Sequence, residues 1–225
     1  MKRLAPIVSL SGLYGVTPDD ADSARLLTRV RAALEGGMRI LQYRNKSADA
    51  RLRREQATAL RALCRDYDAA LIINDDLELA LAVDADGLHL GGEDGSLAAA
   101  RARLGPDKWL GASCYRSLDN AERALAEGAD HIAFGSFFVS TVKPGAVRST
   151  PSILTEAKQK FNVPVVAIGG ITLDNASVLI AAGADSVAVI TALFGAPDVT
   201  LAAQKFNALF GDPSVRPDET KPETV

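Results

Sequence analysis

Eight short apolar runs, separated by segments of helical pattern, constrain the fold of this chain more than any other feature of its sequence. Between the runs, apolar residues recur three and four positions apart, as in Ala24–Leu34 and Leu52–Cys64, which is typical of amphipathic helices. Strands that alternate with helices predict an α/β fold with a parallel sheet. The expected strands are Gly12–Val16, Arg39–Tyr43, Ala70–Asn74, Gly87–Leu90, Lys108–Ser113, His131–Phe134, Val163–Ile168 and Ser186–Ile190.

Eight strand–helix units in one chain of 225 residues predict a single-domain (β/α)8 TIM barrel, which we expect over residues 1–210. The alternative is an open doubly wound sheet, which often shows a Gly-x-Gly-x-x-Gly turn after its first strand. Here the first run continues through Val16, Thr17 and Pro18 without that turn. Residues 211–225 are rich in proline and charge and nearly free of apolar side chains, so we expect a disordered tail there.

Composition excludes several classes of function. The net charge of −3 gives no positive field for nucleic acid or an anionic membrane, and no apolar run reaches the length of a membrane span. Cys64 and Cys114 lack metal-site spacing and suit a reducing compartment. The basic start from Met1 to Pro6 shows no signal-peptide pattern. We expect a cytoplasmic protein whose partners are small molecules; a homo-oligomer stays open.

Carboxylates follow two neighbouring strands. One expected strand leads to Asp75 and Asp76, and the next leads to Glu93 and Asp94. Successive strand ends are neighbours at one rim of a barrel, so Asp75 and Asp94 are expected to lie close together. Mg²⁺ prefers one or two carboxylates and takes its other ligands from water and substrate phosphate. We predict that Asp75 and Asp94 hold Mg²⁺, whereas Asp76 is expected to cap the following helix and Glu93 to lie at the surface.

Basic and hydroxyl side chains follow other strands. Arg44 and Lys46 come directly after the second run and suit the binding of a polyanion. The alternative is a solvent-exposed basic loop that binds no ligand. Ser113 offers a hydroxyl to a phosphate. No acid–base pair that could activate Ser113 or Cys114 as a nucleophile is evident, so we expect Cys114 to be a buried, unreactive thiol.

A second anion site is predicted on the far side of the barrel. Gly169 and Gly170 follow the seventh run and Thr191 follows the eighth, and loops at these places in a barrel commonly bind phosphate through backbone N–H groups. The long segment after the sixth run, from Gly135 to Gly145, mixes hydroxyls with a lysine. It suits a ligand clamp or, alternatively, a flexible insertion.

Two histidines, His89 and His131, lie inside expected strands. Each is either a general base that faces the barrel interior or, as we expect, a hydrogen-bonded structural residue. The strand ends thus offer a basic, metal-binding site and a neutral phosphate site, without a covalent nucleophile. This combination favours the joining of two phosphorylated substrates with loss of pyrophosphate over hydrolysis.

Six segments, in order over nearly the whole expected barrel, carry a resemblance to a known family. They are Gln42–Lys46, Ile73–Asp75, Ala85–Asp94, Gly111–Ser113, Pro164–Ile171 and Gly183–Ile190. Together they resemble the thiamine-phosphate synthases. The chain departs from the family pattern in three places: Val142 replaces a usual threonine, Tyr115 a frequent histidine and Gly92 a frequent glutamine.

The resemblance implies an enzyme that condenses 4-amino-5-hydroxymethyl-2-methylpyrimidine diphosphate with 4-methyl-5-(2-phosphooxyethyl)thiazole, or its carboxylated form. The products would be thiamine phosphate and pyrophosphate, and the reaction would pass through a pyrimidine cation with Mg²⁺ as cofactor. Arg44, Ser113 and Lys143 would be catalytic, and Asp75 and Asp94 would hold the metal. The pyrimidine diphosphate would contact Gln42, Tyr43, Arg44, Asn45, Lys46, Asn74, Ser113 and Lys143, and the thiazole phosphate would contact Ser140, Thr141, Val142, Gly170, Ile190 and Thr191.

Two other functions fit parts of the same pattern. A thiazole tautomerase-like isomerase would bind the thiazole phosphate alone and would need neither the metal aspartates nor the basic run. A non-catalytic regulator would bind a phosphorylated ligand without releasing pyrophosphate. We expect neither, because two phosphate sites and a metal site occur together.

Overall fold

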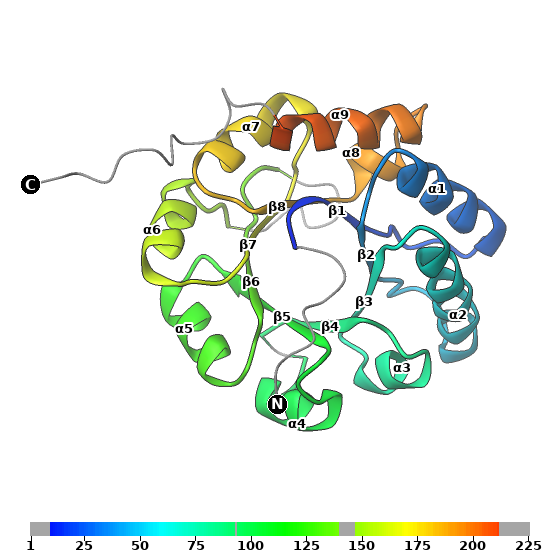
Figure 1. The fold of residues 1–225 in the computed structure, drawn as a ribbon, viewed down its shortest axis with the longest axis horizontal. Coiled ribbons are helices and arrows are strands. Elements are labelled where there is room, and N and C mark those ends of the chain that lie inside the picture. The colour runs from blue at the N-terminus through cyan, green and yellow to red at the C-terminus, as the bar shows by residue number, and fades with distance from the viewer. Residues whose placement is uncertain (1–9, 93, 140–146, 212–225) are drawn as a thin grey trace, which may run out of the picture.

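The computed structural model describes residues 10–92, 94–139 and 147–211, and its eight parallel strands close into a barrel in sequence order (Figure 1). The barrel closes where β1 pairs with β8. The predicted (β/α)8 fold is therefore confirmed. The strands are β1 Gly12–Val16, β2 Ile40–Tyr43, β3 Ala70–Asn74, β4 Gly87–Leu90, β5 Trp109–Tyr115, β6 His131–Phe134, β7 Val165–Ile168 and β8 Ser186–Val189.

Strand boundaries differ from the prediction where local chemistry intervenes. β7 begins at Val165, two residues later than expected, because Pro164 has no N–H to give to the sheet. β5 runs on to Tyr115 through a register shift against β6 that lies between Ser113 and Tyr115. β8 ends at Val189, since Ile190 already precedes a short helix.

Helices surround the barrel on the outside (Figure 1). Several of them begin at a side-chain cap, for example Asp76, whose carboxylate accepts the N–H of Leu79 at 2.9 Å. The capping role predicted for Asp76 is thus confirmed. The helices are α1 Ser23–Glu35, α2 Ala50–Asp66, α3 Leu77–Ala82, α4 Leu97–Leu104, α5 Leu118–Ala126, α6 Ser152–Lys160, α7 Leu173–Ala181, α8 Thr191–Phe194 and α9 Val199–Gly211. No helix in the described ranges is long and apolar enough to cross a membrane.

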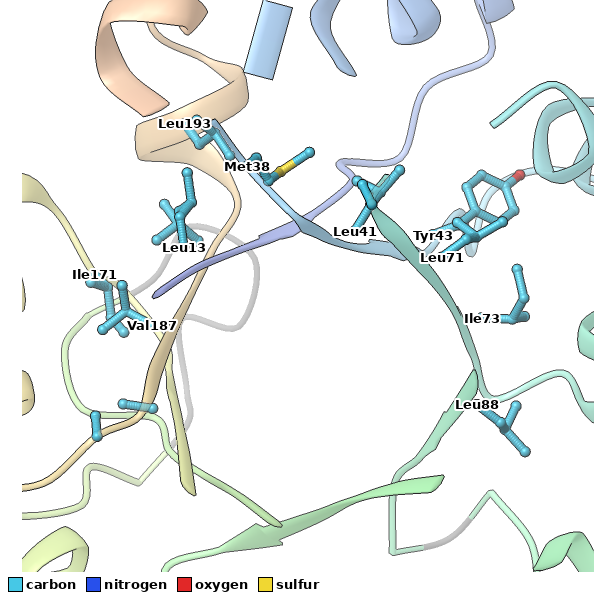
Figure 2. Packing of buried hydrophobic residues seen from close by; sticks show 14 of the residues in the cluster. Leu13, Met38, Leu41, Tyr43, Leu71, Ile73, Leu88, Ile171, Val187 and Leu193 are labelled. Atoms are coloured by element: carbon cyan, nitrogen blue, oxygen red, sulfur yellow. The ribbon is translucent and has the colours of Figure 1, made fainter. Parts of the chain in front are cut away.

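The core has two parts, because alternate residues of each strand point to opposite faces. Leu41, Tyr43, Leu71 and Ile73 lie on the outer face and pack in the layer between strands and helices (Figure 2). A second, smaller cluster fills the barrel interior; it contains Leu10, Tyr14, Val16, Ile40, Ile72, Ala133, Val166 and Ala188. Burial of the larger outer layer supplies most of the apolar stabilisation of the fold.

An aspartate placed directly before a strand recurs at the amino-terminal rim of the barrel. Its carboxylate accepts the N–H of a residue near the start of the preceding strand, at 2.7–2.9 Å, and also pairs with a helix cation. Two of these aspartates end a Gly-Ala-Asp sequence, which occurs at residues 128–130 and 183–185. The three sets are Asp86 with Leu71 and Arg61, Asp130 with Leu110 and Arg101, and Asp185 with Val165 and Lys158.

The first strand pair has a different clamp. Arg39, not an aspartate, precedes β2. The N–H of Leu13 in β1 is instead 3.3 Å from Oδ1 of Asn207, which comes from α9, and Nδ2 of Asn207 donates to Gly36 at 3.2 Å. The last helix therefore completes the clamp of the first strand.

Candidate active site

A cavity of about 470 Å³ opens at the carboxyl ends of the strands. Its walls are mainly apolar, and its polar groups come from several different strands. It is lined by Tyr14, Val16, Gln42, Arg44, Asn74, His89, Ser113, Tyr115, Arg116, Ala133, Gly135, Ser136, Val147, Val166, Ile168, Gly169, Ala188 and Ile190. A concave, mostly apolar pocket with a few converging polar groups suits a small ligand with a ring and charged substituents.

Arg44 is held in place by the loop after β1. The hydroxyl of Thr17 donates to the carbonyl of Arg44 and accepts its N–H, both at 2.8 Å. The guanidinium of Arg44 donates to Oδ1 of Asp19 at 2.9 Å, and the same oxygen accepts the N–H of Lys46 at 3.0 Å. Thr17 and Asp19, neither of which the sequence reasoning singled out, therefore position the cation at the cavity wall.

The other residues of the basic run divide between cavity and scaffold. Gln42 faces the barrel interior, where its amide donates to the hydroxyl of Tyr14 at 3.0 Å. The Tyr43 side chain lies on the outer face, with its hydroxyl 2.8 Å from Gln56 (Figure 2). Asn45 is buried and donates to Asp20 at 2.7 Å. Any contact of Tyr43 or Asn45 with a ligand in the cavity would therefore use the backbone.

The two predicted metal residues come together beside the cavity. Asp75 lies at the end of β3 in the left-handed region, with φ of 62°, and its N–H donates to His89 in β4 at 2.9 Å. Burial raises the pKa of Asp94, and the adjacent Asp75 carboxylate raises it further, while Lys46 opposes the shift. Lys46 lies 3.1 Å from Asp75. The neighbouring carboxylates of Asp75 and Asp94 repel each other when both are charged, and a cation beside them reduces this repulsion.

This arrangement fits Mg²⁺. Among the described residues, no group of three or more His, Cys, Asp or Glu side chains could hold a metal ion. A pair of carboxylates with room for water and phosphate oxygens is nevertheless the protein contribution that Mg²⁺ commonly uses. After burial, the nearby Asp75 carboxylate is the next cause of the raised pKa of Asp94, and a divalent cation would relieve that repulsion.

Ser113 lines the cavity and is tied to a histidine. Its hydroxyl lies 2.9 Å from Nε2 of His89. Burial lowers the pKa of His89 to about 4, so its ring is neutral near pH 7. Cys114, the next residue, is buried, and burial raises the pKa of its thiol to about 12, which agrees with the unreactive thiol expected from the sequence.

His131 corrects one prediction. It is fully buried inside the barrel, with its ring centroid 5.8 Å from that of His89 and 5.9 Å from that of Trp109. Neither of its ring nitrogens has a hydrogen-bond partner in the described part of the chain, so the hydrogen-bonded structural role is confirmed for His89 and wrong for His131. Burial, with a smaller effect of His89, holds the pKa of His131 well below its usual range.

The opposite wall comes from β7 and β8. Gly169 and Ile190 line the cavity, and Thr191 begins α8. Gly169 and Gly170 have φ of 107° and 66°, and Gly170 lies so close to the backbone of Phe138 that a side chain would not fit. These two glycines allow the residues that follow β6 to pack closely against the loop after β7.

Several expected contacts cannot be placed. Ser140, Thr141, Val142 and Lys143, together with Glu93, lie outside the described residues. The structure adds cavity residues that sequence reasoning did not assign, chiefly Tyr14, Tyr115, Arg116 and Ser136. Period-two alternation from Val16 back to Tyr14 could have identified Tyr14 as an inward residue.

Comparison with known proteins gives a consistent result. The sequence model of the thiamine monophosphate synthase family matches residues 13–193. A thiamine-phosphate synthase of Methylobacillus flagellatus is 52% identical over 201 residues, covering 89% of this chain and 96% of the relative. One from an Azoarcus species is 54% identical over 201 residues, covering 89% and 98%.

A solved structure agrees with both. Thiamine phosphate pyrophosphorylase from Pyrococcus furiosus superposes with a TM-score of 0.80 at 37% identity, over 91% of this chain and 96% of the other. The family match runs from β1 into α8 and thus includes the whole barrel with its carboxyl-terminal rim. The chain therefore belongs to the thiamine monophosphate synthase family and is an enzyme, a transferase of the thiamine-phosphate synthase type.

Proposed function

We propose that the cavity joins 4-amino-5-hydroxymethyl-2-methylpyrimidine diphosphate to 4-methyl-5-(2-phosphooxyethyl)thiazole, or its carboxylated form. The products are thiamine phosphate and pyrophosphate. The observation that carries the proposal is the cluster of Asp75, Asp94 and Lys46 beside a cavity wall that contains Arg44. A diphosphate with a bound metal needs carboxylates for the metal and cations for its remaining charge, and this rim supplies both.

The cavity has separate places for the two substrates. A guanidinium, an amide and a hydroxyl from the ends of β2, β3 and β5 (Arg44, Asn74 and Ser113) face one side, which suits the diphosphate. The glycine loop after β7 and the start of α8 form the other side, where barrels commonly bind a phosphate. Apolar residues between them, such as Val166 and Ala188, suit two uncharged rings.

Leaving-group departure is the step that the protein must assist. Mg²⁺ held by Asp75 and Asp94 would neutralise charge on the diphosphate oxygens. Arg44 binds the same group through its planar fork, and Ser113 donates its hydroxyl. Lys143, assigned by resemblance, would add a further cation.

Bond formation then needs little from the protein beyond placement. Loss of pyrophosphate leaves a cation on the pyrimidine methylene carbon, and the neutral thiazole nitrogen attacks that carbon. No base is required, which agrees with a neutral, buried His89 as the nearest histidine. The apolar wall excludes water that would otherwise capture the cation. Positioning of the two rings supplies much of the remaining acceleration.

A pyrophosphate-release assay tests the proposal. The full chain is incubated with both substrates, with Mg²⁺ or with EDTA, and with each substrate alone. We expect release only with both substrates and Mg²⁺, together with one thiamine phosphate per pyrophosphate. Absence of release under every condition would contradict the proposal, and isomerisation of the thiazole phosphate alone would identify a tautomerase instead.

A further inference from the structure

Tyr115 has an unusual place in the active-site rim. It is the last residue of β5, its backbone lies in the left-handed region with φ of 56°, and its side chain is 45% exposed. A bulky side chain rarely adopts this conformation unless its surroundings enforce it. Here the carbonyl of Tyr115 accepts the N–H of Gly135 at 2.8 Å and the hydroxyl of Ser149 at 3.4 Å, which fixes the backbone.

The side chain of Tyr115 reaches across to the loop that carries Asp94. Its hydroxyl accepts the N–H of Gly92 at 3.2 Å. The ring also covers Gly92, since a Cβ added there would lie 3.1 Å from Cε2 of the ring. A side chain at position 92 would have to displace the tyrosine ring, so the two residues are packed against each other.

Gly92 stands at the centre of a tight turn. The N–H of Asp94 donates to the carbonyl of Gly91 at 3.3 Å, which closes the turn around Gly92. The carboxylate of Asp94 folds back against Gly91. Gly92 is thus close along the chain to Asp94, whose carboxylate lies next to Asp75.

We propose that Tyr115 is a positioning residue for the metal site: its hydroxyl and ring hold the Gly91–Asp94 turn so that the Asp94 carboxylate faces Asp75. The inference rests on the proposed metal role of Asp75 and Asp94. Groups that orient a metal ligand without touching the metal commonly tune metal affinity. Because the Tyr115–Gly92 hydrogen bond is solvent-exposed, its loss costs little folding stability, as water replaces the hydroxyl.

The test measures Mn²⁺ binding to the substrate-free protein by electron paramagnetic resonance, with Mg²⁺ activation curves in parallel. Tyr115→Phe removes only the hydroxyl, and we expect about three- to tenfold weaker Mn²⁺ binding. The Mg²⁺ concentration for half-maximal rate should rise by the same factor, while excess Mg²⁺ restores kcat. Gly92→Ala perturbs the same contact from the other side and should also weaken binding.

Two controls separate the possible outcomes. Tyr67→Phe removes a phenol hydroxyl that bonds Glu35 away from the site and should leave Mn²⁺ binding unchanged. Asp94→Asn should abolish it. If the wild-type chain binds no Mn²⁺, the proposed metal site fails and this inference fails with it. If wild type binds, Asp94→Asn does not, and Tyr115→Phe binds as tightly as wild type, the positioning role alone is overturned.

Discussion

Nε2 of His89 lies 2.9 Å from the hydroxyl of Ser113, so a neutral histidine buried beneath the cavity orients the hydroxyl proposed to meet the diphosphate. A neutral imidazole has one donor nitrogen and one acceptor nitrogen. If Nε2 carries the proton, the histidine donates to the serine oxygen, and the serine proton is free to point toward the substrate. His89 thus acts on the reaction through Ser113.

Replacing His89 tests this relationship. We expect His89→Phe to lower kcat about tenfold, because the Ser113 hydroxyl loses its orientation. The cationic side chains proposed to bind the diphosphate stay in place. A cycle with Ser113→Ala should be strongly non-additive, the double variant being little slower than Ser113→Ala alone. Full additivity in steady-state pyrophosphate release would show that the two side chains act separately.

Replacing the adjacent residues Asp75 and Asp76 should affect different properties, activity for Asp75 and stability for Asp76. Asp75→Ala removes a proposed metal ligand, and we expect pyrophosphate release to fall at least a hundredfold, by analogy with loss of an electrostatic stabiliser. Asp76→Ala removes the cap of α3 and should cost about 1 kcal/mol of unfolding free energy with near-normal activity. Urea unfolding and the release assay on the same two variants check both expectations. Near-normal turnover by Asp75→Ala would remove the basis for the metal site.

Acid should destabilise the barrel through His131. Its folded-state pKa is depressed below the ordinary 6.5, so only the unfolded chain takes up this proton as the pH falls below that value. The free energy of unfolding then declines by about 1.4 kcal/mol per pH unit for this residue, and nothing is lost above pH 7.

His131→Phe removes that dependence. Between pH 7.5 and 5.0, we expect the variant to lose less unfolding free energy than wild type, while carboxylates contribute equally to both. Urea denaturation at several pH values measures the difference. Parallel stability curves for the two proteins would mean that His131 titrates normally in the folded state.

The clamp aspartates should set stability without affecting catalysis. Asp130 and its partner Arg101 are mostly buried, with side-chain exposures of 15% and 19%. We expect Asp130→Ala to lower the free energy of unfolding by about 2–4 kcal/mol, because the N–H of Leu110 and the mostly buried guanidinium of Arg101 both lose their acceptor. Asp130→Asn keeps an acceptor oxygen and should cost less. Substrate KM values at 25 °C should stay within twofold for both, and a large change in KM would show that this rim communicates with the cavity.

Much of the fold could be predicted because its signals are local. Each strand is a short apolar run, and the glycines at 37, 128 and 183 close helices with φ between 94° and 107°. Boundaries shifted at particular places, such as Pro164 before β7 and the register shift in β5. The neighbouring positions of Asp75 and Asp94 followed from strand order alone, since consecutive parallel strands end at the same rim.

The remaining features depend on contacts that no local pattern encodes. Whether Gln42 and Tyr43 point inward or outward depends on the register of β2, and Asn45 proved to be a buried scaffold residue because Asp20 and Gln56 converge on it. The bulge that turns Tyr115 toward Gly92 arises from pairing of β5 with β6. Such contacts join residues distant in sequence and become visible only once the barrel closes.

The clamp that Asn207 provides for Leu13 has a consequence for synthesis of the chain. Nascent polypeptide emerges from its amino terminus, so β1 is exposed long before its partners β8 and α9 exist. The clamp on Leu13 therefore forms only after α9 has left the ribosome. A chain interrupted before Asn207 would keep the pairing of β1 with β8 but would lose the side chain that accepts the N–H of Leu13 and donates to Gly36.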